Sequence, residues 1–273
     1  MAVRTTVALV LAFASTILIS LSYLREHRAV ADLPPLGLRR PLRSVHLLLT
    51  NRAWLGGFAM ESAGFALYVA ALALAELALV QSVAAGGIGV LAVASARMGR
   101  RPLVARERGG ATLAVVGLLF LAVSLTGGGE GDAGGSIGAI LAWLGATAAV
   151  VGLILLFARQ IGGGLANAIA GGLCFSAADL CTKLVTQGGV RLAFAAPMAA
   201  GYLLGTSLLQ IGYQAGAALT VAGIATLLTN ALPIAAGTVL LGEPVPAGVL
   251  GVLRVLAFLT VVGGAALLAR PQR

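Results

Sequence analysis

Long apolar stretches recur along the whole chain and leave little room for any other class of fold. Nine stretches have roughly the 17 to 25 residues that a helix needs to cross a bilayer core of about 30 Å. Hydrophobic residues form 59% of the 273 residues and charged residues only 10%, a balance that soluble domains do not show. We therefore expect an all-α fold, a polytopic membrane helical bundle of about nine transmembrane helices. The stretches cover residues 5–24, 53–75, 78–96, 109–125, 137–158, 163–185, 192–214, 217–241 and 247–269.

Basic residues lie almost entirely in the predicted loops. In a nine-span bundle the 18 Lys and Arg residues fall on one face, apart from Arg4, Lys183 and Arg191 at the other face and Arg254 within a span. Cytoplasmic loops carry such an excess. We therefore expect a multi-pass protein of the cell membrane, with its N-terminus outside and its C-terminus in the cytoplasm. Because the basic residues lie in loops beside the membrane, we interpret the net charge of +9 as a sign of contact with the lipid bilayer and not with nucleic acid.

The loop predicted between the first two spans, residues 25–52, contains Glu26 and both histidines, His27 and His46. Isolated loop histidines are more often solvated than bound to a ligand, and Glu26 stands among arginines. We expect this loop to lie at the cytoplasmic interface of the membrane.

The second stretch carries a carboxyl group, Glu61, about two turns inside an apolar helix. Trp54, Phe58, Phe65 and Tyr68 share its helical face. A carboxylate at this depth is costly and is functional more often than not. Either Glu61 is neutralised in a packing seam, or it is an ion- or proton-binding acid in an aromatic-lined cavity. We favour the second interpretation.

Charged residues also occur inside two predicted spans of the second half. Asp179 and Lys183 are spaced to pair at i and i+4 on one helix. Arg254 lies in the last span at a depth similar to that of Asp179, measured from the same side, and an arginine there needs a carboxylate or water. We expect a structural ion pair formed from Asp179, Lys183 and Arg254, with a binding role for Asp179 and Lys183 as the alternative.

Polar side chains also follow one face of the seventh and of the eighth predicted span. Gln210 and Tyr213 lie on a polar stripe in residues 192–214, and Thr226 and Asn230 precede Pro233 in residues 217–241. A polar seam of this length rarely faces lipid. It either holds helices together or lines a polar path.

The order of spans is the same in the two halves of the chain. Residues 1–125 hold four spans, residues 126–160 an acidic external linker and a fifth span, and residues 161–273 four more. An offset of five spans makes corresponding helices run in opposite directions, which predicts two inverted repeats joined by a linker helix.

Short motifs resemble the drug/metabolite transporter superfamily. LLGEP at residues 240–244, followed by a glycine-rich final span, is similar to the GE turn of EamA-type transporters. Glu61, Phe65 and Tyr68, followed by LVQS at residues 79–82, resemble the nine-span NIPA-type magnesium transporter-like branch. The resemblance implies a transporter built from two inverted repeats.

We expect a secondary transporter that works by alternating access, without enzymatic activity or a cofactor, because no nucleotide-binding, triad or zinc motif is visible. The sequence leaves the identity of the substrate open between two candidates. For a divalent cation such as magnesium, Glu61 would be the metal ligand, with Gln210, Thr226, Asn230 and retained waters. For a proton-coupled exporter of a small metabolite, amino acid or amphipathic drug, aromatic walls that include Phe65, Tyr68 and Tyr213 would surround the solute.

Two further alternatives stay open. One is a non-transporting membrane scaffold, which would tolerate the loss of Glu61. The other concerns assembly, since two copies could associate as a homodimer.

The nine-span topology makes a direct prediction about sidedness. Cysteines introduced at Arg101 and Thr126 should react with an impermeant thiol reagent from opposite sides of the membrane, because one span separates them. Labelling of both positions from the same side would exclude this topology.

Overall fold

The computed structural model describes residues 2–38, 40–75, 77–84, 87–99, 104–124, 135–242 and 248–269, which contain helices and no strand. Gly86, most of the predicted external linker, and Glu243 and Pro244 of the LLGEP motif lie outside the described residues. The helices are α1 (Ala2–Ala31), α2 (Pro41–Thr50), α3 (Arg52–Leu74), α4 (Leu77–Ala84), α5 (Gly87–Gly99), α6 (Ala105–Ser124), α7 (Ile137–Leu156), α8 (Ala158–Ile161), α9 (Gly163–Thr186), the 3-10 helix η1 (Gly189–Phe194), α10 (Ala195–Ala215), α11 (Ala218–Leu240) and α12 (Val249–Ala269).

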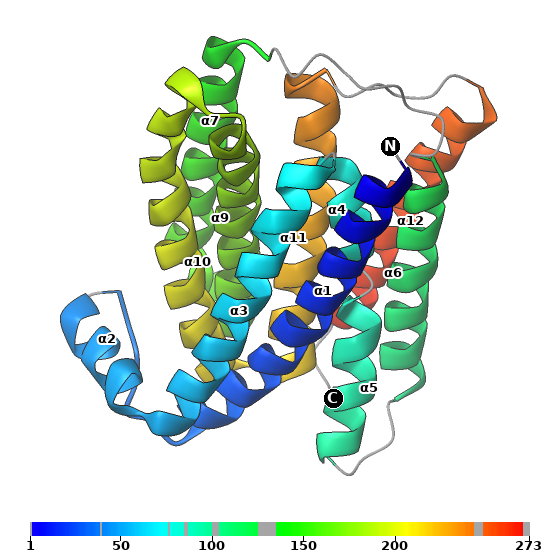
Figure 1. Cartoon of the computed structure of the whole chain (residues 1–273). Helices are drawn as coiled ribbons and strands as arrows, with labels where there is room; N and C mark the ends of the chain where they lie inside the picture. The colour runs from blue at the N-terminus through cyan, green and yellow to red at the C-terminus, as the bar shows by residue number, and fades with distance from the viewer. Residues whose placement is uncertain are drawn as a thin grey trace.

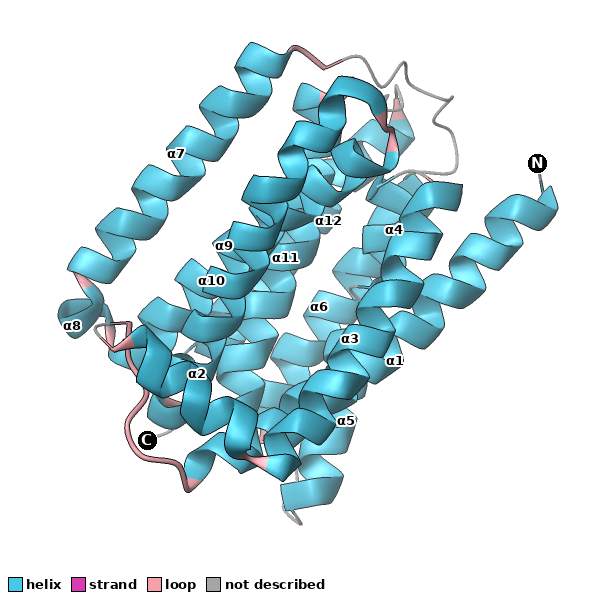
Figure 2. Cartoon of the chain, turned by 60° about the vertical axis from the view of Figure 1, so that its left-hand side comes forward, coloured by secondary structure: helices cyan, strands magenta, loops and turns pink. Residues whose placement is uncertain are grey.

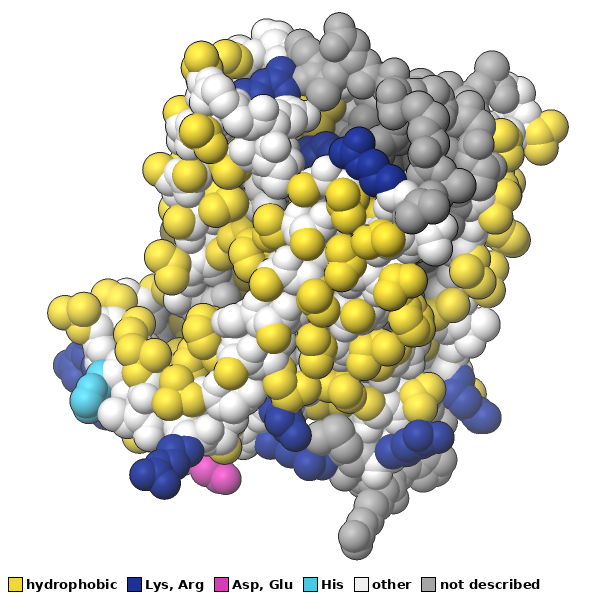
Figure 3. Space-filling model, in the orientation of Figure 1, with side chains coloured by type: hydrophobic (Ala, Val, Ile, Leu, Met, Phe, Trp, Pro, Cys, Tyr) yellow, Lys and Arg dark blue, Asp and Glu magenta, His cyan; other side chains and the backbone are white. Residues whose placement is uncertain are grey.

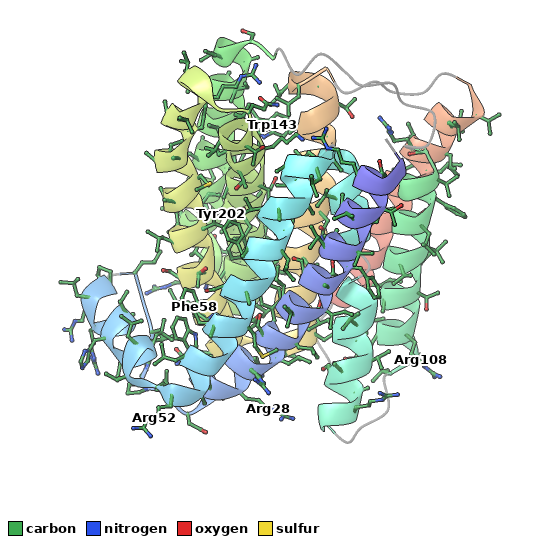
Figure 4. All side chains as sticks on the ribbon, in the orientation of Figure 1. Arg28, Arg52, Phe58, Arg108, Trp143 and Tyr202 are labelled. Atoms are coloured by element: carbon green, nitrogen blue, oxygen red, sulfur yellow. The ribbon has the colours of Figure 1, made fainter. Side chains whose placement is uncertain are left out.

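Among the described residues, six helical segments are long and apolar enough to cross a membrane, namely α1, α3, α7, α9, η1 with α10, and α11. The structure is therefore that of a membrane-embedded helical protein. Figure 3 shows hydrophobic side chains over the middle of one face and Lys and Arg side chains towards its two ends. Arg28, Arg52 and Arg108 lie at the same end of the bundle (Figure 4). We refer to it as the arginine-rich end.

The first helix is longer than its hydropathy predicts. The apolar stretch ends near residue 24, but α1 continues to Ala31 because no glycine or proline interrupts the chain before Pro34. Glu26 and His27 therefore belong to a helix and not to a solvated loop. Glu26 is completely buried, with 0% of its surface exposed.

The third predicted span contains two described helices, α4 and α5, which lie on either side of residues 85 and 86. Both are apolar, as the hydropathy of this stretch predicts.

The two halves make matching sets of contacts (Figures 1 and 2). α1 packs along α3 as α9 packs along α10, and α1 contacts α4 and α5 as α9 contacts α11. Across the halves, α1 meets α10 and α3 meets α9, while α6 packs along α12. α1 and α9 run in opposite directions through the bundle (Figure 1).

Glycines allow the closest of these helix crossings. A Cβ at Gly64 of α3 would lie 2.7 Å from Ile19 of α1, and one at Gly172 of α9 would lie 3.0 Å from the Cα and carbonyl oxygen of Ala225 on α11. Apolar helices in lipid gain little from hydrophobic burial, so close backbone approach is a main source of their packing energy.

The crossing of α9 and α11 can be tested at Gly172. Gly172→Ala should lower the free energy of unfolding by about 1 to 3 kcal/mol, because backbone atoms of Ala225 must move. The measurement is unfolding in mixed detergent micelles. Gly145 on α7 is the matched control, since a Cβ there has no neighbour within 4 Å. An equal loss in Gly145→Ala would show that close packing at Gly172 is not the cause, because helix propensity alone favours alanine over glycine.

Candidate functional site

A cavity of about 250 Å³ lies between helices of both halves. Its wall combines hydroxyl groups, aromatic rings, two carboxyl groups and one amide. The lining residues are Ser15, Thr16, Ile19, Ser20 and Tyr23 of α1; Phe58, Glu61, Ser62, Phe65 and Tyr68 of α3; Ala84 of α4; Phe175 and Asp179 of α9; Tyr202 and Thr206 of α10; and Thr226, Thr229 and Asn230 of α11.

The structure brings most of the sequence-predicted binding residues together at this cavity. Glu61, Phe65, Tyr68, Thr226 and Asn230 all line it. They reach it from α3 and α11, helices that are far apart in the sequence. The helical periodicity of each segment was sufficient to put them on one face.

Gln210 and Tyr213 lie behind the cavity wall on α10. The Gln210 amide nitrogen donates a hydrogen bond to the Glu26 carboxylate on α1. Tyr213 packs edge-on against His27, with ring centroids 5.5 Å apart. His27 Nε2 lies 3.3 Å from the carbonyl oxygen of Gly216, so the expectation of a solvated histidine is wrong for His27.

The carboxyl group of Glu26 lies against that of Glu61, within hydrogen-bonding reach. Gly57 allows this approach, because a Cβ at that position of α3 would lie 2.8 Å from Cγ of Glu26. Sequence reasoning missed Glu26 by assigning it to a loop. Ser15, Ser22 and Glu26, spaced i, i+7 and i+11, gave the available signal of a polar helical face.

This carboxyl pair is short of hydrogen-bond donors. Glu26 Oε1, Glu61 Oε2 and Gln210 Oε1 are buried and have no hydrogen-bond partner among the described residues. All three are acceptors when the carboxyls are ionised. Two carboxylates in contact also repel each other. A single proton shared by the pair supplies a donor and removes that repulsion.

The second acid of the cavity, Asp179, is held by phenols. The Tyr202 hydroxyl donates to Asp179 Oδ1 at 2.6 Å, and Tyr68 also hydrogen-bonds Asp179. Tyr202 lies 3.0 Å from Thr182 Oγ1 as well, which fixes its ring. Asp179 is thus part of the cavity wall, beyond the structural role predicted for it.

The other two members of the predicted ion-pair group contact different helices. Lys183 Nζ donates to the carbonyl oxygens of Leu72 and Ala75, at 3.1 and 2.8 Å, at the C-terminal end of α3. Arg254 lies 3.4 Å from the hydroxyl groups of Ser124 and Thr238. Pairing of either basic residue with Asp179 stays a prediction.

A clamp joins the two halves at the arginine-rich end. The Gln214 amide nitrogen of α10 lies 3.1 and 3.2 Å from the carbonyl oxygens of Val30 and Leu33, and its oxygen accepts from the Leu36 backbone nitrogen at 2.8 Å. We call this contact the Gln214 clamp. The bonds from Lys183 to α3, the Lys183 clamp, join the halves at the opposite end.

The donor set can be compared with what a metal requires. In the part of the chain that the structure describes, no group of three or more His, Cys, Asp or Glu side chains could hold a metal ion. Glu26 and Glu61 together offer two carboxylates. Magnesium accepts one or two carboxylates when it keeps most of its waters, so the pair fits a hydrated ion and not a dehydrated cage.

No protein-family model, curated protein or solved structure matches this chain.

The bond between Gln210 and Glu26 predicts non-additive stability effects. Gln210→Met should lower the free energy of unfolding by about 1 to 3 kcal/mol, because it removes the donor to a buried carboxylate. Adding Glu26→Met should recover most of this loss, since both polar partners are then replaced by apolar groups. Unfolding in mixed micelles measures each variant, with Gln160→Met at the exposed Gln160 as control. Additive losses would show that the two side chains do not interact.

Proposed function

We propose that the chain is a secondary transporter of the drug/metabolite type, which moves a small solute across the cell membrane in exchange for protons. The observation that carries this proposal is the pair of carboxyl groups formed by the buried Glu26 and the half-buried Glu61, beside a cavity built from both halves. The resemblance of LLGEP and of the Glu61, Phe65, Tyr68 pattern to that superfamily supports it.

The matching contacts of the two halves support alternating access. The contact of α1 with α10 corresponds to the contact of α9 with α3 when the two halves are superposed on each other. The first contact carries the Gln214 clamp at one end of the bundle, and the second carries the Lys183 clamp at the other end. In the proposed cycle the Gln214 clamp opens towards the cytoplasm and the Lys183 clamp towards the outside. The halves rock about the central cavity, and the chain begins outside and ends in the cytoplasm.

The carboxyl pair supplies the coupling step. When one proton is shared, Glu26 and Glu61 remain in contact; when it leaves, two adjacent negative charges repel each other and favour a rearrangement of α1 against α3. Gln210 transmits the change to α10, because it donates to Glu26.

Transport of a hydrated divalent cation is the second candidate, because two adjacent carboxylates offer oxygen ligands. It differs from proton exchange in what the pair must do. A metal ion needs both acids ionised, whereas proton exchange needs one to take up and release a proton.

The test is flux into liposomes that contain the purified protein and a pH-sensitive dye. A solute gradient of a lipophilic amine or an amino acid should move protons with the wild type. Glu61→Gln and Glu26→Gln should reduce proton-coupled flux to the level of empty liposomes, because neither amide can release a proton. The variants should still fold, since an amide avoids the cost of a buried charge.

Asp32→Asn is the matched control, because Asp32 is an exposed acid outside the cavity. Wild-type flux in Glu61→Gln would place the proton site elsewhere. Magnesium flux without proton movement would favour the cation transporter. Absence of flux for every solute would favour a scaffold.

A further inference from the structure

The cavity wall carries acids without bases. Glu61 and Asp179 line it, and none of the lining residues that the structure describes is a lysine, arginine or histidine. Such a site favours a positively charged ligand and repels an anion. The two acids have different surroundings, because Glu61 contacts a second carboxyl group and Asp179 contacts two phenols.

Aromatic rings cluster around the two phenols that bind Asp179. Phe65 and Tyr202 meet edge to face, with centroids 4.8 Å apart at 71°. Tyr68 lies 6.2 Å from Phe65, and Phe175 lies 6.2 Å from Tyr202. All four rings belong to the cavity wall. We refer to Phe65, Tyr68, Phe175 and Tyr202 as the aromatic box. Figure 4 labels Tyr202 partway along α10.

The aromatic box gives Asp179 the features of a site for an organic cation. Ring faces attract an ammonium group within about 6 Å, most strongly where water is excluded. The phenol donors of Tyr68 and Tyr202 hold the carboxylate in place at the cavity wall. A hydrated metal ion gains little from such walls, because it keeps its waters.

We infer that Asp179 and the aromatic box bind the amine group of the transported solute, a small organic cation with an apolar portion. Glu61 lies two helical turns from Tyr68 along α3, roughly 10 Å away, so the proton site and the amine site are separate. The cavity of about 250 Å³ lies below the range of about 300 to 1,000 Å³ typical of drug-sized ligands, so the solute is smaller. Transport of this amine rests on the proposed function, but its binding does not.

Direct binding tests the inference. Calorimetry on the purified protein in detergent would compare 2-phenylethylamine with the neutral 2-phenylethanol and the anionic 3-phenylpropionate, three probes of similar size. The amine should bind at least about tenfold more tightly than the other two. Asp179→Asn should weaken amine binding by about tenfold or more and should leave the weak binding of 2-phenylethanol unchanged.

Two further variants keep the inference testable if Asp179→Asn does not fold. Phe175→Leu removes one ring of the box, and Tyr202→Phe removes one donor but keeps its ring. Each should weaken amine binding about two- to tenfold. Asp32→Asn, which removes an exposed acid, should bind the amine as the wild type does.

The outcomes separate this inference from the proposed function. Loss of coupled flux in Glu61→Gln tests the proposed function, whereas loss of amine affinity in Asp179→Asn tests the amine site. Amine binding that depends on Asp179, without any coupled flux, would sustain the amine site and overturn the transporter. Equal affinity for the three probes, or unchanged amine affinity in Asp179→Asn, Phe175→Leu and Tyr202→Phe, would overturn the amine site.

Discussion

A carboxyl group inside an apolar helical bundle must obtain hydrogen bonds from other side chains, because no bulk water reaches it. This requirement organises the centre of the protein. Glu26 of α1 takes its donor from Gln210 of α10, and Asp179 of α9 takes donors from Tyr202 of α10 and Tyr68 of α3. Each bond joins different helices. In surroundings as apolar as the helices themselves, such bonds fix which faces meet.

The polar centre depends in turn on glycines behind it. Gly57 lets Glu26 approach α3, and Gly205 of α10 lies under Phe175, whose ring would be 2.8 Å from a Cβ there. A methyl group at Gly205 would displace the Phe175 ring of the cavity wall, and one at Gly57 would displace Glu26 from α3. The small residues therefore determine the shape of the site, although they contribute no chemistry to it.

The sequence could predict those parts of the site whose residues lie on one helix, and it could not predict contacts between different helices. Glu61, Phe65 and Tyr68 share a face through helical periodicity alone, so their convergence on the cavity was predictable. Glu26 was not found, because hydropathy falls at Arg25 while the helix continues to Ala31. The phenol partners of Asp179 come from other helices, and no periodicity within one helix can reveal such a partner. From the sequence, Lys183 and Arg254 were the expected partners of Asp179, because opposite charges can be identified without knowledge of the fold.

The strengths of the contacts differ between the middle and the ends of the bundle, and this difference bears on the proposed cycle. The Gln214 clamp consists of neutral hydrogen bonds to backbone groups, each worth about 0.5 to 1.5 kcal/mol net, and the bonds from the Lys183 ammonium are worth about 1.5 to 3 kcal/mol each. Water can replace the partners in both clamps, because they lie near the ends of helices. The bonds of Glu26 and Asp179 are buried and involve carboxylates, so breaking one leaves a costly unpaired group. Opening either end is therefore cheap relative to disrupting the centre. The expected motion breaks one clamp at a time and keeps the central cavity intact, and a change at the carboxyl pair needs to bias the two open states by only a few kcal/mol.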